Sequence, residues 1–167
     1  MPVEQSTHNE ALGAALGRLP SGVFVITAKR KDPNDPAKTQ AVGMMSSWVA
    51  QAGFKPVAIS VAVHPDREIY PVIKESGEFC LNVLSTENMD LLRAFSKYTP
   101  DQFNGVATKD VREGVVLLDA VSVLNCKVIG ECALTDHTLF IAEVTGGDYM
   151  DHELSPMIHL RKSGFQY

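Results

Sequence analysis

Two adjacent serines beside the only tryptophan mark the stretch of this chain with the clearest potential for chemistry. Residues 40–54 begin like a β-strand, yet Ser46, Ser47 and Trp48 stand where a purely structural strand would carry β-branched residues. Hydroxyls and exposed backbone N–H groups can hold a ribityl or phosphate tail, while an indole and neighbouring methionines shield a planar ring. A strand end that runs into an Ala/Gly-rich turn is the alternative, and residues 40–54 alone leave both interpretations open.

Three basic side chains could meet the anionic end of such a ligand. Arg67 lies near the expected start of a helix, where backbone N–H groups could bind the same anion, although a solvated helix arginine has the same pattern. Arg93 and Lys97 fall in the last turn of another expected helix. Cations are favourable there without any ligand because of the helix dipole, so both interpretations stay open for them as well.

Two polar positions stand out elsewhere. Asn82 lies in the middle of an apolar strand, where its amide must find hydrogen-bond partners, either on a ligand or on a neighbouring loop that it locks. His137 follows Asp136 at an expected turn, and an Asp-His pair can act as a tuned proton donor near neutral pH or simply stabilise the turn. We place His137 ahead of the other four histidines as a candidate catalytic residue.

Several familiar sites are missing from the sequence. It contains no G-x-G-x-x-G and no G-x-x-x-x-G-K-[ST], which argues against a Rossmann dinucleotide site and a P-loop. G-x-S-x-G, H-E-x-x-H and paired cysteine motifs are also missing, which argues against a hydrolase and a metalloenzyme. Cys80, Cys126 and Cys132 lie in apolar surroundings without metal-ligand spacing, so we expect buried thiols and no metal site.

Composition narrows the class of protein further. A length of 167 residues with 45% hydrophobic and 21% charged residues predicts one globular domain, residues 1–167, with a substantial core. A net charge of -5 without a basic run argues against nucleic-acid partners. No signal-peptide pattern and no apolar run of about 20 residues are present, so we expect a cytoplasmic protein without membrane contact.

Periodicity predicts a mainly β chain with a few peripheral helices. We expect strands at residues 22–29, 40–46, 57–63, 78–84, 115–118, 120–134 and 138–149. We expect helices at residues 9–19 and 66–75, and a third after residue 88 with Met89, Leu92 and Phe95 on one face. Because helices do not alternate with the strands, the pattern predicts a closed antiparallel barrel with helices packed outside it rather than a doubly wound sheet.

Five segments in this order resemble the flavin reductase-like family, whose fold is an FMN-binding split β-barrel of antiparallel, Greek-key type. They are Pro20-Ser-Gly-Val-Phe-Val-Ile-Thr27, Gly43-Met-Met-Ser-Ser-Trp48, Pro56 with a buried strand ending at Arg67, Phe79-Cys-Leu-Asn-Val-Leu84 and Asp136-His137. In detail the chain is most similar to the flavin reductase-like domain at the C-terminus of cyanobacterial diflavin (flavodiiron) proteins. Residues 46–54, 62–67 and 159–167 carry that likeness.

The resemblance implies FMN as cofactor and NAD(P)H as hydride donor. The cofactor-binding residues that it implies are Met44, Met45, Ser46, Ser47, Trp48, Gln51, Ser60, Val61, Ala62, Val63, Arg67, Asn82 and Lys97. Residues 45–48 would follow the ribityl chain and ring, the backbone of residues 60–63 the polar edge of the ring, and Arg67 and Lys97 the phosphate. His137 would lie on the nicotinamide side.

The sequence departs from the family pattern at three places. Met44-Met45 replaces the usual Thr-Ala before the serines, and Thr135 replaces the glycine before Asp136-His137. Gln102 stands where the family often has arginine, which weakens the expected phosphate site.

The leading expectation is therefore an NAD(P)H-dependent flavin reductase that forms a homodimer and acts on small-molecule flavin and nicotinamide. A non-catalytic FMN-binding electron-transfer module that serves a flavodiiron-type partner is the main alternative. A related split-barrel protein that holds haem or a pyridoxine phosphate is the third. The sequence leaves open the choice between NADH and NADPH, the tightness of FMN binding and the electron acceptor.

Overall fold

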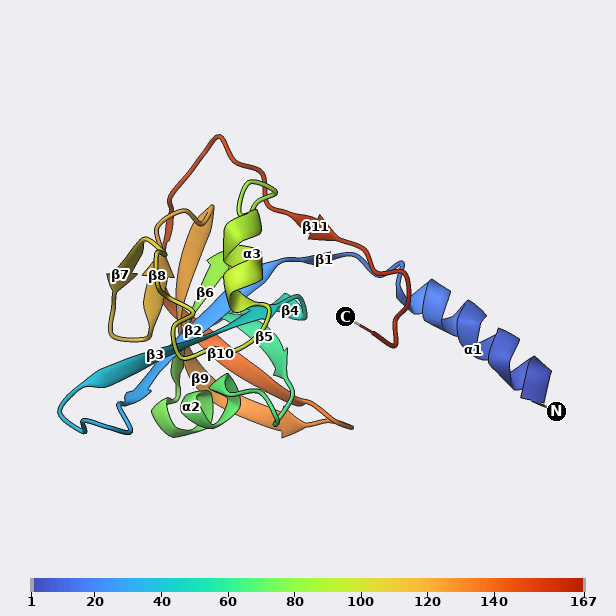
Figure 1. The fold of residues 1–167 in the computed structure, drawn as a ribbon, viewed down its shortest axis with the longest axis horizontal. Coiled ribbons are helices and arrows are strands. Elements are labelled where there is room, and N and C mark those ends of the chain that lie inside the picture. Colours follow the sequence, from blue (N-terminus) through green and yellow to red (C-terminus); the bar gives the residue numbers. More distant parts are fainter. Residues whose placement is uncertain (1, 167) are drawn as a thin grey trace.

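A seven-stranded antiparallel sheet forms the body of the computed structural model, which describes residues 2–166 and the side chains of residues 9–166 (Figure 1). The strands follow the order β3-β2-β6-β9-β10-β5-β4 across the sheet. Their bounds are β2 (Phe24–Lys31), β3 (Thr39–Ser46), β4 (Val49–Phe54), β5 (Val57–Val63), β6 (Glu78–Val83), β9 (Ser122–Ala133) and β10 (Thr138–Tyr149). The fold class predicted from the sequence, mainly β and antiparallel, is confirmed.

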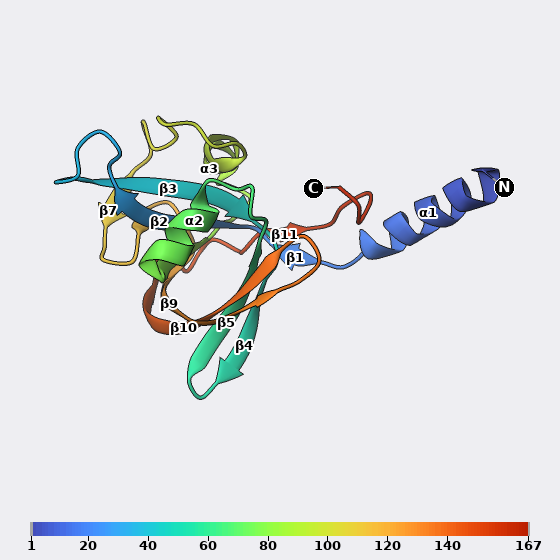
Figure 2. The same cartoon turned by 90° about the horizontal axis from the view of Figure 1, so that it is seen from below.

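The two edges of this sheet are consecutive strands. β3 and β4 lie at opposite ends of the strand order, yet only Ser47 and Trp48 separate them in the chain. A two-residue link forces the sheet to roll until its edges meet at one corner, as Figure 2 shows. Because β3 and β4 do not pair, the barrel is split rather than closed, so the closed barrel expected from periodicity is wrong and the split form implied by the resemblance is correct.

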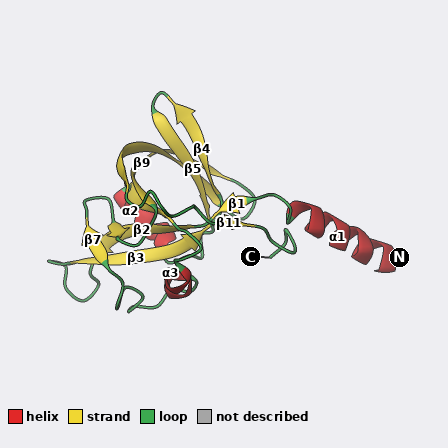
Figure 3. Cartoon of the chain, turned by 90° about the horizontal axis from the view of Figure 1, so that it is seen from above, coloured by secondary structure: helices red, strands yellow, loops and turns green. Residues whose placement is uncertain are grey.

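Irregular pairing lets the long strands bend around the barrel. The β9–β10 register shifts between Ile141 and Ala142 and again between Val144 and Gly146. A bulged strand twists more strongly and changes direction, which a barrel of few strands needs. The β4–β5 hairpin, with its own register shift between Gln51 and Gly53, extends beyond the rest of the barrel (Figure 3).

The barrel interior is filled by side chains from most strands and from one helix. α2 (Ile69–Ser76) lies across one end and buries Ile69, Val72 and Ile73. They pack with Ile26, Val42, Val61, Val63, Phe79, Phe140 and further residues of one continuous core cluster. α2 ends at Gly77, whose positive φ of 67° is favourable for glycine. α2 begins later than the helix predicted at residues 66–75, since its N-cap is Glu68, and no side chain caps it.

A second cluster lies between the sheet and α3 (Met89–Phe95). Leu91 and Phe95 are the buried residues of α3, whereas Met89 is 48% exposed, so the predicted apolar face of this helix is shifted. Phe95 packs directly on Gly43 of β3: a Cβ added there would lie 2.5 Å from the Phe95 ring. Close packing at Gly43 thereby fixes α3 beside the end of β3.

A small hairpin of β7 (Thr108–Asp110) and β8 (Val115–Leu117) covers another part of the sheet. Thr27 holds it, because its hydroxyl donates to the Val115 carbonyl at 2.6 Å and accepts from the Val115 N–H at 3.0 Å. The strand predicted at residues 115–118 therefore corresponds to β8, the strand of this hairpin that is hydrogen-bonded to the sheet.

The N-terminal and C-terminal segments of the chain contact each other beside the barrel. α1 (Pro2–Leu16) projects away from the sheet, and β11 (Ile158–His159) pairs with β1 (Ser21–Gly22) (Figures 1 and 2). We call residues 156–166 the C-terminal arm. The arm contacts the end of α1 so closely that a Cβ on Gly17 would lie 2.4 Å from the Arg161 carbonyl oxygen. Among the described helices, none has the length and apolarity needed to cross a membrane.

The bounds predicted from the sequence agree best with the structure where they depend only on residues that are neighbours in the chain. The strands at residues 57–63 and 138–149 have the predicted bounds, while the strand predicted at 120–134 begins and ends slightly inside that range. The first helix starts and ends earlier than the predicted 9–19, because the arm packs on Gly17 and closes off its continuation.

The three cysteines differ in environment. Burial raises the pKa of Cys80 and of Cys126 to about 12, so both are protonated and unreactive near neutral pH. Cys132 is exposed, and its predicted burial is therefore wrong: it lies near the end of β9, where the strand runs beyond the covered part of the sheet.

Candidate functional site

A cavity of about 440 Å³ lies where the two edges of the sheet meet. Its lining comes from six segments: the residue between β1 and β2, the end of β3, the Ser47–Trp48 corner, the end of β5 with the following turn, α3 with its C-terminal end, and the C-terminal arm. The lining residues are Val23, Met44, Met45, Ser46, Ser47, Trp48, Ala62, His64, Arg67, Leu92, Arg93, Ser96, Met157 and His159.

The lining combines an apolar wall with hydroxyl and cationic groups. Met45 and Trp48 are each 37% exposed, which is unusual for such large side chains unless they face a ligand or a partner. Three serines and two arginines also line the cavity, and no aspartate or glutamate is among the described lining residues. In a chain with a net charge of -5, this is a local concentration of positive charge suited to an anionic ligand that has a flat apolar part.

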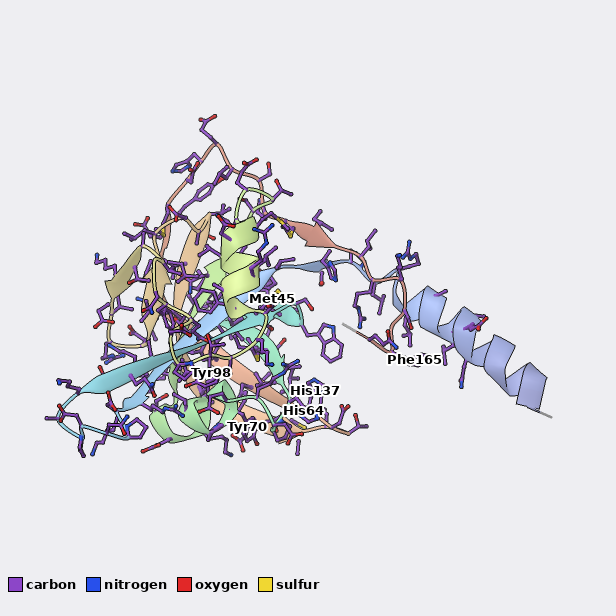
Figure 4. The ribbon with its side chains drawn as sticks, viewed as in Figure 1. Met45, His64, Tyr70, Tyr98, His137 and Phe165 are labelled. Atoms are coloured by element: carbon purple, nitrogen blue, oxygen red, sulfur yellow. The ribbon has the colours of Figure 1, made fainter. Side chains whose placement is uncertain are left out.

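Trp48 is held between groups from distant parts of the chain. The His137 ring lies 4.9 Å from the indole, centroid to centroid, and the Arg161 guanidinium lies 5.4 Å over the indole in cation–π geometry. The His64 ring meets His137 edge-on at 5.1 Å, and Figure 4 shows these two histidines side by side. The orientation of the indole thus depends on β10 and on the C-terminal arm together.

His137 stands behind the cavity wall. Its Nδ1 lies 2.8 Å from Asp136 Oδ1, and this hydrogen bond lowers the pKa of the Asp136 carboxyl. The resulting carboxylate only accepts hydrogen bonds, so His137 Nδ1 carries the hydrogen. His137 contacts Trp48 and His64 but is not itself a lining residue, and its catalytic role stays a prediction.

His64 and Arg67 share the turn that connects β5 to α2. The Arg67 N–H donates to the His64 carbonyl at 3.0 Å, and the Asp66 N–H donates to His64 Nδ1 at 3.1 Å. Both side chains line the cavity. Val63, the last residue of β5, pairs with Thr138 at the start of β10, which brings the turn beside Asp136 and His137.

Seven of the predicted site residues lie together around the cavity. They are Met44, Met45, Ser46, Ser47, Trp48, Ala62 and Arg67. Val61 and Val63 instead point into the barrel core, where each is 1% exposed. Ser60 lies in the middle of β5, opposite Ala50 on one side and Ile141 on the other. Gln51 and Lys97 are exposed, and neither is among the described lining residues.

Asn82 is fully buried away from the cavity. Its Nδ2 donates to the Val25 carbonyl at 3.2 Å and the Val115 carbonyl at 3.3 Å, and its Oδ1 accepts from the Leu117 N–H at 2.8 Å. The amide therefore locks β8 onto the sheet, which is the structural alternative that the sequence left open.

Gln102, which replaces the arginine expected from the resemblance, is also buried. Its Nε2 donates to the Gly43 carbonyl at 3.1 Å, while its Oε1 has no partner among the described residues. Gln102 thus supports β3 from behind and supplies no charge to the cavity.

Arg93, which the sequence offered as a possible anion-binding cation, also lines the cavity, whereas the lining residues Val23, His64, Leu92, Ser96, Met157 and His159 were missed from the sequence. Arg93 and Ser96 are three positions apart, so helical spacing could have placed them on one face. Met157 and His159 reach the cavity through backbone pairing with distant residues, Met157 with Leu84 and β11 with β1, which leaves no local signal.

Comparisons with known proteins agree on one family. The model of the Flavin reductase like domain matches residues 16–166. The Putative diflavin flavoprotein A 3 of Nostoc sp. (strain PCC 7120) is 37% identical over 161 residues, which cover 93% of this chain and 27% of that protein. Diflavin flavoprotein A 1 of Synechocystis sp. (strain PCC 6803) is 34% identical, with coverage of 93% and 27%. The chain thus spans about a quarter of the length of these curated relatives.

A solved structure shares the fold at lower identity. The Streptomyces globisporus C-1027 NADH:FAD oxidoreductase SgcE6, solved in complex with NAD and FAD fragments, superposes with a TM-score of 0.78. It is 21% identical to this chain, and the alignment covers 92% of this chain and 87% of the other.

Substitution of Asn82 tests the assignment of this residue to the scaffold. Asn82→Ala leaves the Leu117 N–H and two carbonyl oxygens without their partner, and we expect it to lower the free energy of unfolding by about 3 kcal/mol. Gln51→Ala, at the exposed position predicted for the same ligand, should change it by less than about 0.5 kcal/mol. Urea denaturation followed by circular dichroism measures both values, and equal effects of the two substitutions would contradict the assignment.

Proposed function

Because this chain belongs to the flavin reductase-like family, we propose that it binds FMN in the cavity at the split of the barrel and reduces it with hydride from NADH or NADPH. The observation that carries the proposal is the chemistry of the lining: an indole and methionines beside serine hydroxyls and two arginines, at the corner where the sheet edges meet. The two named relatives, both diflavin flavoproteins, support flavin binding, and the solved NADH:FAD oxidoreductase of the same fold supports reduction by a nicotinamide.

The residues present fit FMN. The apolar wall of Met45, Trp48 and Met157 suits a tricyclic ring, and Ser46 and Ser47 can hydrogen-bond a ribityl chain. Arg67 and Arg93 can neutralise the phosphate. We therefore propose Arg93, which lines the cavity and pairs with Asp90 at 3.0 Å, as the second phosphate-binding cation in place of Lys97, which is not among the described lining residues.

The protein contributes position, shielding and electrostatics. Bound FMN would supply the hydride-accepting ring nitrogen, which no amino-acid side chain offers. Trp48, fixed by His137 and Arg161, covers one side of the cavity and limits access of water. The arginines lower the energy of an electron-rich ligand, so the site needs no acid–base dyad of the kind found in hydrolases.

Anaerobic mixing tests this function directly. The FMN-loaded protein should lose its absorbance near 450 nm when mixed with NADH or NADPH in a stopped-flow instrument, and comparing the two rates identifies the preferred nicotinamide. An unchanged spectrum with both would refute the reductase assignment.

A non-catalytic electron-transfer module is the second candidate. It is favoured by the similarity to a region that makes up 27% of each of two diflavin flavoproteins, because such a region can receive electrons from another part of the same protein. In that case the bound flavin would be reduced slowly by nicotinamide in the stopped-flow experiment and rapidly by a reduced protein donor.

Two cation substitutions test the phosphate site. Arg93→Ala should weaken FMN binding about tenfold, because a charge-assisted hydrogen bond is lost, while Lys97→Ala should leave it unchanged. Quenching of Trp48 fluorescence gives both dissociation constants. A larger effect of Lys97→Ala than of Arg93→Ala would restore the phosphate ligand expected from the sequence.

We also propose that the chain forms a homodimer. The C-terminal arm exposes three large apolar side chains, with Ile158 75%, Leu160 52% and Phe165 56% exposed, and α1 projects beside it with Leu12 45% exposed. Apolar side chains gathered in this way are typical of an interface. Sedimentation equilibrium should give about twice the chain mass at micromolar concentration, and Ile158→Lys should shift the equilibrium toward monomer. A monomer that still binds FMN would refute the dimer.

A further inference from the structure

His64 is the lining residue whose chemistry the proposed function leaves unused. Its Nδ1 accepts the Asp66 N–H at 3.1 Å, and a ring nitrogen that accepts a hydrogen bond carries no hydrogen. The hydrogen of the neutral imidazole therefore lies on Nε2. Because Nδ1 is directed at the turn, Nε2–H is the polar group that His64 can offer to the cavity that it lines.

The surroundings of His64 restrict its ring to one orientation. The His137 ring meets it edge-on at 5.1 Å, and His137 is itself fixed by the Asp136 carboxylate. The Asp66 carboxylate lies 3.7 Å from His64 Nδ1, on the side away from Nε2. A donor whose orientation is fixed before binding loses little conformational entropy when the ligand arrives.

Arg67 places a guanidinium beside this donor. The Arg67 N–H donates to the His64 carbonyl at 3.0 Å, so the two residues belong to one hydrogen-bonded turn, and both side chains line the same cavity. A neutral N–H donor next to a permanent cation, with no carboxylate among the described lining residues, is a suitable arrangement for phosphate oxygens.

We propose that His64 is an anion-binding residue, whose Nε2–H donates to an oxygen of a phosphate that Arg67 neutralises, and that His137 is the positioning residue behind it. The inference rests on the proposed function and extends it by naming the ligand group at this corner. Two sources share this chemistry, the phosphate of FMN and the diphosphate of a nicotinamide dinucleotide. The competing explanation is that His64 only stabilises the turn.

Two substitutions at position 64 separate these explanations. The side-chain oxygen in His64→Asn can accept the N–H two residues along the chain, as in an Asx turn, so the turn is kept while the donor toward the cavity is lost. In His64→Gln the longer amide reaches the former position of Nε2 and offers an N–H there. A role confined to the turn predicts that Asn is the better replacement, and an anion-binding role predicts that Gln is.

The experiment compares ligands with and without phosphate on the full chain. Quenching of Trp48 fluorescence, from the only tryptophan, gives dissociation constants for FMN, riboflavin and ADP-ribose. We expect His64→Asn to weaken FMN binding about tenfold and leave riboflavin unchanged, with His64→Gln close to the original protein. Thermal unfolding of both variants checks that the fold is retained.

The remaining outcomes are distinct. If His64→Asn weakens ADP-ribose and leaves FMN unchanged, the anion-binding role stands and the phosphate belongs to the dinucleotide. Equal weakening of FMN and riboflavin, or unchanged binding of both FMN and ADP-ribose, overturns the inference while flavin binding itself persists. Failure of the unaltered protein to bind either flavin overturns the proposed function, and the inference with it.

Discussion

The two-residue link between β3 and β4 is the constraint on which the rest of the structure depends. Three Cα–Cα steps from Ser46 to Val49 span at most roughly 11 Å, so the opposite edges of a seven-stranded sheet must come together there. Strands that meet at an angle cannot continue a hydrogen-bonded ladder through the corner. Ser47 and Trp48 consequently lie outside β3 and β4 and line the cavity, while the Trp48 carbonyl accepts from the Ala62 N–H of β5 at 3.1 Å.

Tight packing of α2 and α3 against the barrel fixes the elements around this corner. α2 fills one end of the barrel with aliphatic side chains, and Phe95 of α3 is seated on Gly43, three positions before Ser46. The buried Thr27 hydroxyl and Asn82 amide hold the backbone of β8 in place, because they form hydrogen bonds with its peptide groups. These contacts leave the interior little freedom to rearrange and hold the elements that line the cavity in place.

Charge in this protein is unevenly distributed. The chain carries a net charge of -5, yet Arg67 and Arg93 line the cavity and Arg161 lies over Trp48 at 5.4 Å. Each arginine belongs to a different segment: the turn after β5, α3 and the C-terminal arm. Only a fold that brings these segments to one corner creates an anion-attracting site on an otherwise acidic protein.

The sequence by itself determined the features that depend on neighbours in the chain. Runs of apolar, largely β-branched residues at 57–63 and 138–149 predicted those strands, and consecutive positions 44–48 necessarily reached one place together. Gly77 ends α2 just after the predicted helix at residues 66–75, because a positive φ at that point favours glycine whatever surrounds it.

Only the tertiary structure decided which predicted polar groups face the cavity and which hold the scaffold. Asn82 and Arg67 carry equally plausible signals in the sequence, but Asn82 is buried by β8 and Arg67 reaches the cavity. His64, Met157 and His159 enter the site through strand pairings with residues far away in the chain. Local periodicity carries no information about such pairings, because the free energy that fixes them comes from packing between distant segments rather than from the residues next to them.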